Sequence, residues 1–313
     1  MIPKLIYIAA AIFVVFALLP SLVMTWFAFS RRNPKDFDAR LDLFETEKYA
    51  PYKERILRDM ADMRKLPFKT VCIESGDGIP LRGEWLDLGQ KRTAILLHGY
   101  CSTPANNFCS LLHYFRESGW NVLMIYQRAH GKSGGKATTF GLRERYDLVN
   151  WLDWAAKTTG GSPVLLYGIS MGGATIAAAS RLIQETNVRA CVIDAGYDSP
   201  CEQFKHQCIV RHAPWRIVLP LVSLFAGLLL KADVREDFAD ALAESRIPTL
   251  FIYQTGDASV PVACGRHCYE NCGGPKQWLE IEKGGPHAMA FISGGDVVRQ
   301  TLTDFVKEQD WSV

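Results

Sequence analysis

Apolar positions along the chain alternate between short β-rich runs and longer stretches with helical spacing. The β-rich runs predict eight strands, at residues 69–74, 81–86, 94–97, 122–126, 164–167, 190–193, 249–253 and 277–281. Helical windows lie between the later strands and after the last one, at 106–118, 142–157, 172–185, 238–244, 262–271 and 296–308. This alternation predicts the α/β class, with an eight-stranded, mostly parallel sheet covered by helices on both faces. The first two strands have no helix between them, so we expect an antiparallel hairpin at one edge.

A run of 26 uncharged residues, 5–30, precedes this pattern. As a helix it is long enough to cross a bilayer, for which about 20 apolar residues suffice. A cleaved signal peptide is the alternative, but the apolar core of such a peptide spans only about 7–15 residues, and no clear A-x-A cleavage site precedes Arg31. We therefore expect a single-pass membrane anchor at 1–33. More basic residues follow the run than precede it, which favours a cytoplasmic location for the rest of the chain.

Two further segments interrupt the alternation. Residues 34–68 are charged and in part helical, at 53–65, and we interpret them as a connector. Between the sixth and seventh predicted strands lies an insertion at about 198–247, whose centre, 217–230, carries no charge. Three interpretations are open for that centre: a lid over a binding site, a helix lying in the membrane surface, or a core helix. The predicted main domain covers 69–313 and includes this helical lid insertion.

The composition is that of an ordinary globular protein, since 48% of the residues are hydrophobic and 22% are charged. These values exclude a disordered or fibrous chain. Lys and Arg total 35 against 33 Asp and Glu, and the only dense basic cluster adjoins the apolar run. Nucleic acid is therefore not an expected partner. The sequence leaves the oligomeric state open.

Nine cysteines are an odd number in a chain long enough to fold without a disulfide framework, so we expect reduced thiols. Cys264, Cys268 and Cys272, with His267 beside them, superficially resemble a metal cluster. Their spacing places them on one side of a helix, and they lack the close CxxC pairs typical of zinc sites. We favour buried core residues here, and we predict neither a metal nor a cofactor.

The strongest motif is Gly168-Ile169-Ser170-Met171-Gly172, which lies between an apolar strand and an Ala-rich helix. A strand-to-helix turn this tight crowds the backbone, which explains the flanking glycines. The turn presents the serine hydroxyl at the carboxyl edge of the sheet, near the positive end of a helix. We predict Ser170 as a nucleophile.

A serine nucleophile needs a histidine base and a carboxylate that orients it. His287 is the best of seven histidines, because its loop directly follows the last predicted strand. Asp257 follows the seventh predicted strand and is the expected acid. Asp194, at the end of the sixth strand, and Asp198 just beyond it are the rivals. Asp257 is preferred because its loop neighbours the strand that leads to His287.

The oxyanion of an acyl-transfer intermediate also needs hydrogen-bond donors. The backbone N–H of Met171, directly after the nucleophile, is the first candidate. The loop that begins His98-Gly99-Tyr100 should supply the second, from the N–H of Tyr100. We interpret His98 itself as structural.

At these motifs the sequence resembles the α/β-hydrolase superfamily, over about residues 65–310. It is most similar to the bacterial membrane-anchored branch that is grouped with serine aminopeptidase-like (S33-type) and acyl-peptidase-related hydrolases. The resemblance implies the α/β-hydrolase fold, with Ser170, Asp257 and His287 as the triad and Tyr100 and Met171 as oxyanion donors. It rests on residues 98–100, 119–122, 128–135, 168–173, 256–257, 260–261 and 285–288. The family often has Asp where this chain has Gln127, so the ion pair of that Asp is missing, with an expected structural consequence.

A serine at the turn favours hydrolysis of a carboxylic ester, thioester or amide through an acyl-serine. The apolar insertion and the predicted anchor favour a lipophilic acyl substrate. A serine aminopeptidase is an alternative, because acidic residues that could hold a substrate ammonium occur near the insertion: Glu202, Asp233, Glu236 and Asp237. A second alternative is a membrane-tethered binding protein without catalysis, since fold alone does not give function.

Overall fold

The fold is built on one eight-stranded sheet. The computed structural model describes residues 4, 6–7, 14–30 and 46–312. The strands are β1 (Lys69–Glu74), β2 (Pro80–Leu86), β3 (Thr93–Leu97), β4 (Asn121–Ile125), β5 (Val164–Ile169), β6 (Val188–Asp194), β7 (Thr249–Gln254) and β8 (Lys276–Ile281). Their order is β1-β2-β4-β3-β5-β6-β7-β8. The two pairings of β2 are antiparallel and all the others parallel, so both the mostly parallel sheet and the edge hairpin are confirmed.

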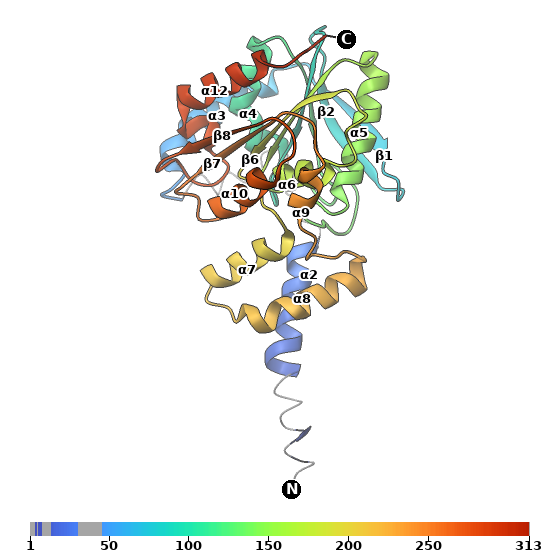
Figure 1. Cartoon of the computed structure of the whole chain (residues 1–313), viewed down its shortest axis with the longest axis vertical. Coiled ribbons are helices and arrows are strands. Elements are labelled where there is room, and N and C mark those ends of the chain that lie inside the picture. Colours follow the sequence, from blue (N-terminus) through green and yellow to red (C-terminus); the bar gives the residue numbers. More distant parts are fainter. Residues whose placement is uncertain (1–3, 5, 8–13, 31–45, 313) are drawn as a thin grey trace.

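Helices cover both faces of the sheet (Figure 1). Those of the main body are α3 (Ala50–Arg64), α4 (Pro104–Glu117), α5 (Glu144–Thr159), α6 (Met171–Ala179), α9 (Phe238–Ala243), α10 (Val262–Asn271), α11 (Ala290–Ser293) and α12 (Gly295–Lys307). Along the central strands, alternate residues belong to two different core clusters, one on each face of the sheet. Ile95 and Leu97 belong to the cluster with α5, α6, α9 and α10, whereas Ala94 and Leu96 belong to the one with α3, α4, α11 and α12. Side chains two residues apart share a face, which is why a fully apolar strand supplies both layers.

Part of the predicted connector contributes to the core. Within 34–68, the helix expected at 53–65 is present as α3, which packs along α4. Ile56, Met60 and Met63 recur at helical spacing and are fully buried in the cluster of that sheet face. Helix α3 is therefore an integral layer of the domain.

The described N-terminal segment consists of a π-helical turn, η1 (Val14–Leu18), and helix α2 (Leu19–Phe29). The predicted span 5–30 lies partly outside the described residues. No helix in the described part of the chain is both long enough and apolar enough to cross a membrane. The end of α2 is joined to the main body: Thr138 N–H donates to the Phe29 carbonyl at 2.9 Å, and the Phe29 ring lies 5.2 Å from that of Phe140.

The insertion between β6 and β7 forms α7 (Pro200–Val210) and α8 (Trp215–Leu230) before α9. Helices α7 and α8 lie beside α2, apart from the sheet (Figure 1). Three residues of α8, Leu219, Val222 and Ala226, are buried, and much of the rest of that helix is exposed. The predicted helical insertion is therefore present, and α8 is only in part a core helix.

Helix α10 carries the three regularly spaced cysteines. Cys264, Cys268 and Cys272 are all buried in a core cluster, and burial raises the pKa of Cys264 to about 12. His267 points elsewhere, with Nε2 2.7 Å from Asp237 Oδ2. Across residues 46–312 and the described part of the N-terminus, no group of His, Cys, Asp or Glu is arranged to hold a metal ion.

Candidate active site

Ser170 occupies a strained turn between β5 and α6. Its backbone has φ 54° and ψ −117°, a conformation that L-residues rarely adopt. A Cβ on Gly168 would come within 2.3 Å of the Gly172 backbone, and a Cβ on Gly172 would come within 1.9 Å of the Leu97 carbonyl oxygen. Both positions therefore require glycine for steric reasons, as the G-x-S-x-G pattern predicts.

The turn brings Ser170 to the histidine that the sequence analysis paired with it. His287 Nε2 lies 2.9 Å from Ser170 Oγ, across 117 residues of sequence. His287 Nδ1 lies 2.6 Å from Asp257 Oδ2. Serine, imidazole and carboxylate thus form one continuous hydrogen-bonded chain at the carboxyl edge of the sheet.

The loop after β7 holds Asp257 as a carboxylate. Its Oδ1 accepts hydrogen bonds from the backbone N–H groups of Ser259 at 2.7 Å and Val260 at 3.1 Å. Burial by itself raises the pKa of Asp257. The charge of His287 and the hydrogen bonds lower that pKa by more than burial raises it, so it lies below its usual range. The group therefore stays ionised and free to orient the imidazole.

The rival carboxylate, Asp194, is not bonded to the imidazole. It is 1% exposed at the end of β6, and its Oδ2 accepts a hydrogen bond from the Tyr167 hydroxyl at 3.0 Å. Burial raises the pKa of Asp194 to about 7. Asp198 lies further along, where its Oδ1 accepts the N–H of Ser199. Of these three carboxylates, Asp257 is the one whose oxygen lies within hydrogen-bond distance of the His287 ring.

The loop after β3 lies against the serine. A Cβ on Gly99 would stand 3.3 Å from the Ser170 Cβ, and the Gly99 N–H is fixed by a 2.8 Å bond to Asn107 Oδ1. Tyr100 lines the same cavity as Ser170 and His287. Met171 is the first residue of α6, where backbone N–H groups have no intrahelical partner.

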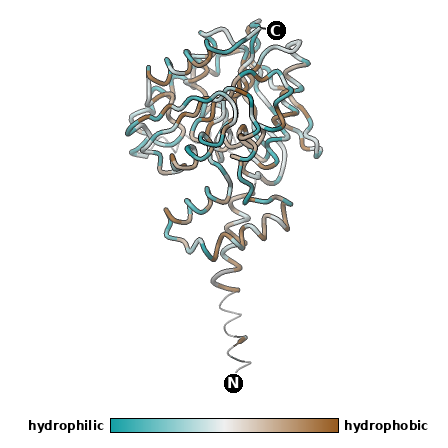
Figure 2. The backbone as a smooth tube through the Cα atoms, viewed as in Figure 1, coloured by the Kyte–Doolittle hydropathy of each residue, from teal (hydrophilic) through white to brown (hydrophobic). Residues whose placement is uncertain are grey.

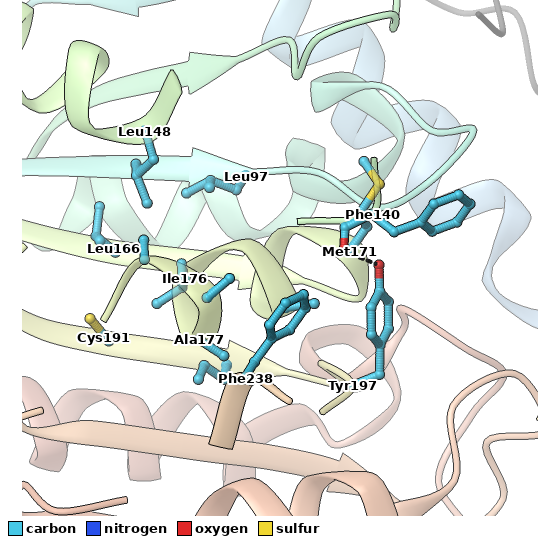
Figure 3. Packing of buried hydrophobic residues seen from close by; sticks show 14 of the residues in the cluster. Leu97, Phe140, Leu148, Leu166, Met171, Ile176, Ala177, Cys191, Tyr197 and Phe238 are labelled. Carbon is cyan, nitrogen blue, oxygen red and sulfur yellow. Dashed lines mark hydrogen bonds between the residues drawn. The ribbon is translucent and has the colours of Figure 1, made fainter. Parts of the chain in front are cut away.

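The side chain of Met171 is part of the core and not of the cavity. Figure 3 shows it beside Phe140 in the cluster beneath the turn, close to Tyr197, whose hydroxyl donates to the Phe140 carbonyl at 3.1 Å. The Thr138 hydroxyl lies 3.4 Å from the Met171 sulfur. These contacts fix the start of α6, and with it the direction of the Met171 N–H.

His98 and Gln127 support the loop from below. His98 is fully buried, and burial together with the neighbouring His130 lowers its pKa to about 3. As a neutral ring, it accepts the Gln127 N–H at Nε2, at 3.1 Å. The Gln127 side chain donates to the His98 carbonyl and accepts from the Thr175 hydroxyl at 2.9 Å. Where the family often has Asp, this glutamine thus ties the loop after β3 to α6 without an ion pair.

Arg128, the residue after Gln127, forms ion pairs with two carboxylates that are distant in the sequence. Its guanidinium donates two 2.6 Å bonds to Asp147 and two further bonds, of 3.0 and 3.1 Å, to Asp77. The hydrogen bonds from Arg128 lower the pKa of Asp77 to about 2. The carboxylate partners of Arg128 thus come from residues 77 and 147, and position 127 supplies none.

Two hollows share His287 and Tyr49 in their walls. A cavity of about 100 Å³ is lined by Ser170, Tyr100 and His287, and by Asn106 from the first turn of α4. A second hollow, of about 400 Å³, is lined by His287 but not by Ser170, and Tyr49, directly before α3, and Tyr52 of α3 form part of its wall. Helix α8 lines neither hollow.

Sequence reasoning missed the residues that α3 and α4 bring to these hollows. Asn106 and Asn107 directly follow the loop after β3. Two polar amides in the first turn of a helix were a signal in the sequence that could have indicated cavity-lining residues. Tyr49 and Tyr52 carried none, because their segment has no motif and is more than two hundred residues from His287.

The acidic residues proposed to hold a substrate ammonium lie elsewhere. None of them lines either hollow beside Ser170. Each is paired with a basic side chain: Glu202 with Lys205, Asp233 with Arg235, Glu236 with Arg145, and Asp237 with His267. These four positions therefore place no carboxylate in the walls of the two hollows.

Curated proteins share this part of the sequence. Uncharacterized protein YqkD of Bacillus subtilis is 29% identical over 217 residues, which is 68% of this chain and 70% of that protein. The lysophosphatidylserine lipase ABHD12 of Xenopus tropicalis is 24% identical over 68% of this chain and 56% of its own length. Human protein ABHD12B is 25% identical over 56% of this chain and 48% of its own length. The chain thus spans about half of the two vertebrate relatives.

Solved structures and a family model agree with the fold. The Pyrococcus furiosus esterase Pf2001 superimposes with a TM-score of 0.64 at 25% identity, over 80% of this chain and 93% of the esterase. The esterase Est1E of Butyrivibrio proteoclasticus gives a TM-score of 0.58 at 16% identity, over 76% of this chain and 98% of its own. Residues 94–209 match the family model for the alpha/beta hydrolase fold. The chain therefore has the α/β-hydrolase fold, and its residues 94–209 match the model of that family.

Proposed function

We propose that this protein is a membrane-associated serine hydrolase that cleaves a carboxylic ester of a lipophilic acyl group. The observation that carries the proposal is the hydrogen-bonded chain from Ser170 Oγ through His287 to Asp257, with distances of 2.9 and 2.6 Å. Distances of this kind are those at which a histidine can take a serine proton.

In the proposed mechanism, Ser170 Oγ attacks the acyl carbon while its proton passes to His287 Nε2. Asp257 accepts a hydrogen bond from Nδ1–H and stabilises the imidazolium that forms. The backbone N–H groups of Tyr100 and Met171 stabilise the oxyanion. The imidazolium then protonates the leaving alcohol, and the acyl-serine remains. A water molecule, deprotonated by His287, releases the acid and restores the serine.

The lipophilic substrate and the membrane association are supported by the apolar N-terminal run and by the relatives. Residues 5–30 carry no charge, and one vertebrate relative, ABHD12, is named as a lysophosphatidylserine lipase. A single-chain lipid ester, presented at a membrane surface, is therefore the substrate class that we propose. The catalytic domain is proposed to lie on the cytoplasmic side, as the basic residues that follow the run suggest.

Hydrolysis of p-nitrophenyl esters of increasing acyl length by the full chain in mild detergent tests this function. Replacing Ser170 by Ala should lower kcat by several orders of magnitude. Ser102→Ala is the matched control, because Ser102 lines the same cavity but is not bonded to His287. Equal turnover by the wild type and Ser170→Ala would refute the nucleophile, and no turnover of any ester would refute the esterase proposal.

A further inference from the structure

Helix α2 buries its two polar side chains, Ser21 and Thr25, and exposes most of its apolar ones. The buried residues are Ser21, Thr25 and Phe29, spaced four apart. Leu19, Leu22, Val23 and Trp26 are 39 to 69% exposed. In a water-soluble helix the apolar stripe faces the core. The reversed arrangement, with small polar residues at the helix contact, is typical of helices that lie in lipid.

Helix α8, which packs beside α2, exposes large apolar side chains in the same region. Ile217 and Leu224 are 50% exposed, and Leu228 and Leu229 are 69% and 62% exposed. Figure 2 shows hydrophobic residues along both helices, away from the main body. We call these eight exposed residues of α2 and α8 the α2–α8 surface. Contiguous apolar patches of such large side chains mark an interaction site.

The charges around this surface favour a bilayer as its partner. Between Glu202 and Asp233 there is no carboxylate, whereas Lys205, Arg211, Arg216 and Lys231 are all present. Arg216 and Lys231 flank α8 at its two ends, and its interior is uncharged. Apolar residues between basic ends suit a helix that lies at the level of anionic headgroups. The Trp26 and Trp215 indoles are also side chains that prefer this interface.

We infer that the α2–α8 surface is a membrane-embedded face, in which α8 lies in the interfacial region of a phospholipid bilayer beside α2. This deepens the proposed membrane association, on which it rests, because α8 then adds a second contact that is separate from the N-terminal run. It also places lipid next to the site. The Tyr100 hydroxyl donates to the Ala28 carbonyl of α2 at 2.8 Å, so the lipid-facing helix ends on the loop that lines the Ser170 cavity.

The test measures where α8 lies in a bilayer, without using activity. The full chain is reconstituted in vesicles of phosphatidylcholine and phosphatidylglycerol, with and without acyl chains brominated to quench tryptophan. Leu228→Trp adds an indole on α8, and Val297→Trp, at a 61% exposed position on α12, is the matched control. We expect the brominated lipid to quench the emission added at residue 228 and to leave that added at residue 297 unchanged.

Equal quenching at both positions, or none at residue 228, would overturn the inference. If the chain fails to float with the vesicles at all, the membrane association fails with it; if it floats without quenching at residue 228, only the role of α8 fails. A detergent-solubilised dimer that L228E/L229E dissociates, without quenching, would assign the surface to a second copy of the chain instead. None of these readouts depends on hydrolysis.

A second measurement connects the surface to substrate access. For an ester held in the vesicles, L228E/L229E should turn over at least about tenfold more slowly, since two charged side chains oppose insertion. For a short water-soluble ester its rate should match the wild type, because α8 does not line the hollows at Ser170. Equal loss on both esters would contradict a role in access.

Discussion

The phenol of Tyr49, at the start of α3, donates a 3.0 Å hydrogen bond to the backbone carbonyl of His287. The two residues are 238 positions apart in the chain. The bond holds the loop that carries the proposed base, and Gln254 supports the same loop with a 3.3 Å bond to the Pro286 carbonyl. Helix α3 therefore contributes to the geometry of the proposed triad although it supplies none of its members.

Removing that bond should impair catalysis without unfolding the protein. A hydrogen bond of this kind contributes about 0.5–1.5 kcal/mol, so Tyr49→Phe should lower kcat by about two- to tenfold with little change in KM. Tyr52→Phe is the control, because Tyr52 lines the same hollow without a bond to His287. Steady-state kinetics on a soluble ester checks this, and an equal effect of the two variants would exclude a positioning role for Tyr49.

The choice between the two carboxylates can be tested directly. Asp257→Asn should lower kcat by about 10⁴, because the amide favours the wrong imidazole tautomer. Asp194→Asn should have a far smaller effect, since the hydrogen bond of Asp194 goes to Tyr167 and not to His287. Single-turnover rates on one ester would measure both. A larger loss for Asp194→Asn would identify that residue as the orienting acid.

The sharp turn at Ser170 should depend on Gly172. In Gly172→Ala, the new Cβ would come within 1.9 Å of the Leu97 carbonyl oxygen. Because that oxygen belongs to the backbone, no change of side-chain rotamer can relieve the clash. We expect a loss of about 3 kcal/mol or more in the free energy of unfolding. Gly76→Ala is the control, because a Cβ there meets nothing within 4 Å. Urea denaturation compares the two, and similar midpoints would contradict the steric argument.

The ion pair between His267 and Asp237 should make stability depend on pH. The hydrogen bond to Asp237 raises the pKa of His267 in the folded protein. Protonation therefore favours the folded state: the contribution is complete below the unfolded pKa, about 6.5, and is lost as pH rises through the higher folded value.

His267→Gln should consequently lower the urea midpoint at mildly acidic pH and leave it unchanged at alkaline pH. Asp237→Asn should remove the same pH-dependent difference, while its amide still caps α9 as the Asp237 carboxylate does through the Ala239 N–H. A deficit in His267→Gln that is equal at all pH values would show that the pair makes no electrostatic contribution.

Local pattern and chain order were enough to predict the strands, the turn at Ser170 and the preference for Asp257 and His287. Apolar runs bounded by glycines specify strands and turns through short-range sterics, and parallel strands bring their carboxyl ends to one edge of a sheet. The two glycines beside Ser170 are required by contacts with their own turn and with β3. Such constraints leave a signature in the sequence because they act on fixed spacings.

Only the tertiary structure placed Tyr49 against His287, α8 beside α2, and Gln127 between the loop after β3 and α6. These contacts join segments far apart in the chain and carry no periodic pattern. The apolar run 217–230 illustrates the limit: the same residues suit a lid, a membrane contact or a core helix. The hydrophobicity of a segment indicates that it avoids water. Which neighbour covers that segment depends on how the whole chain packs.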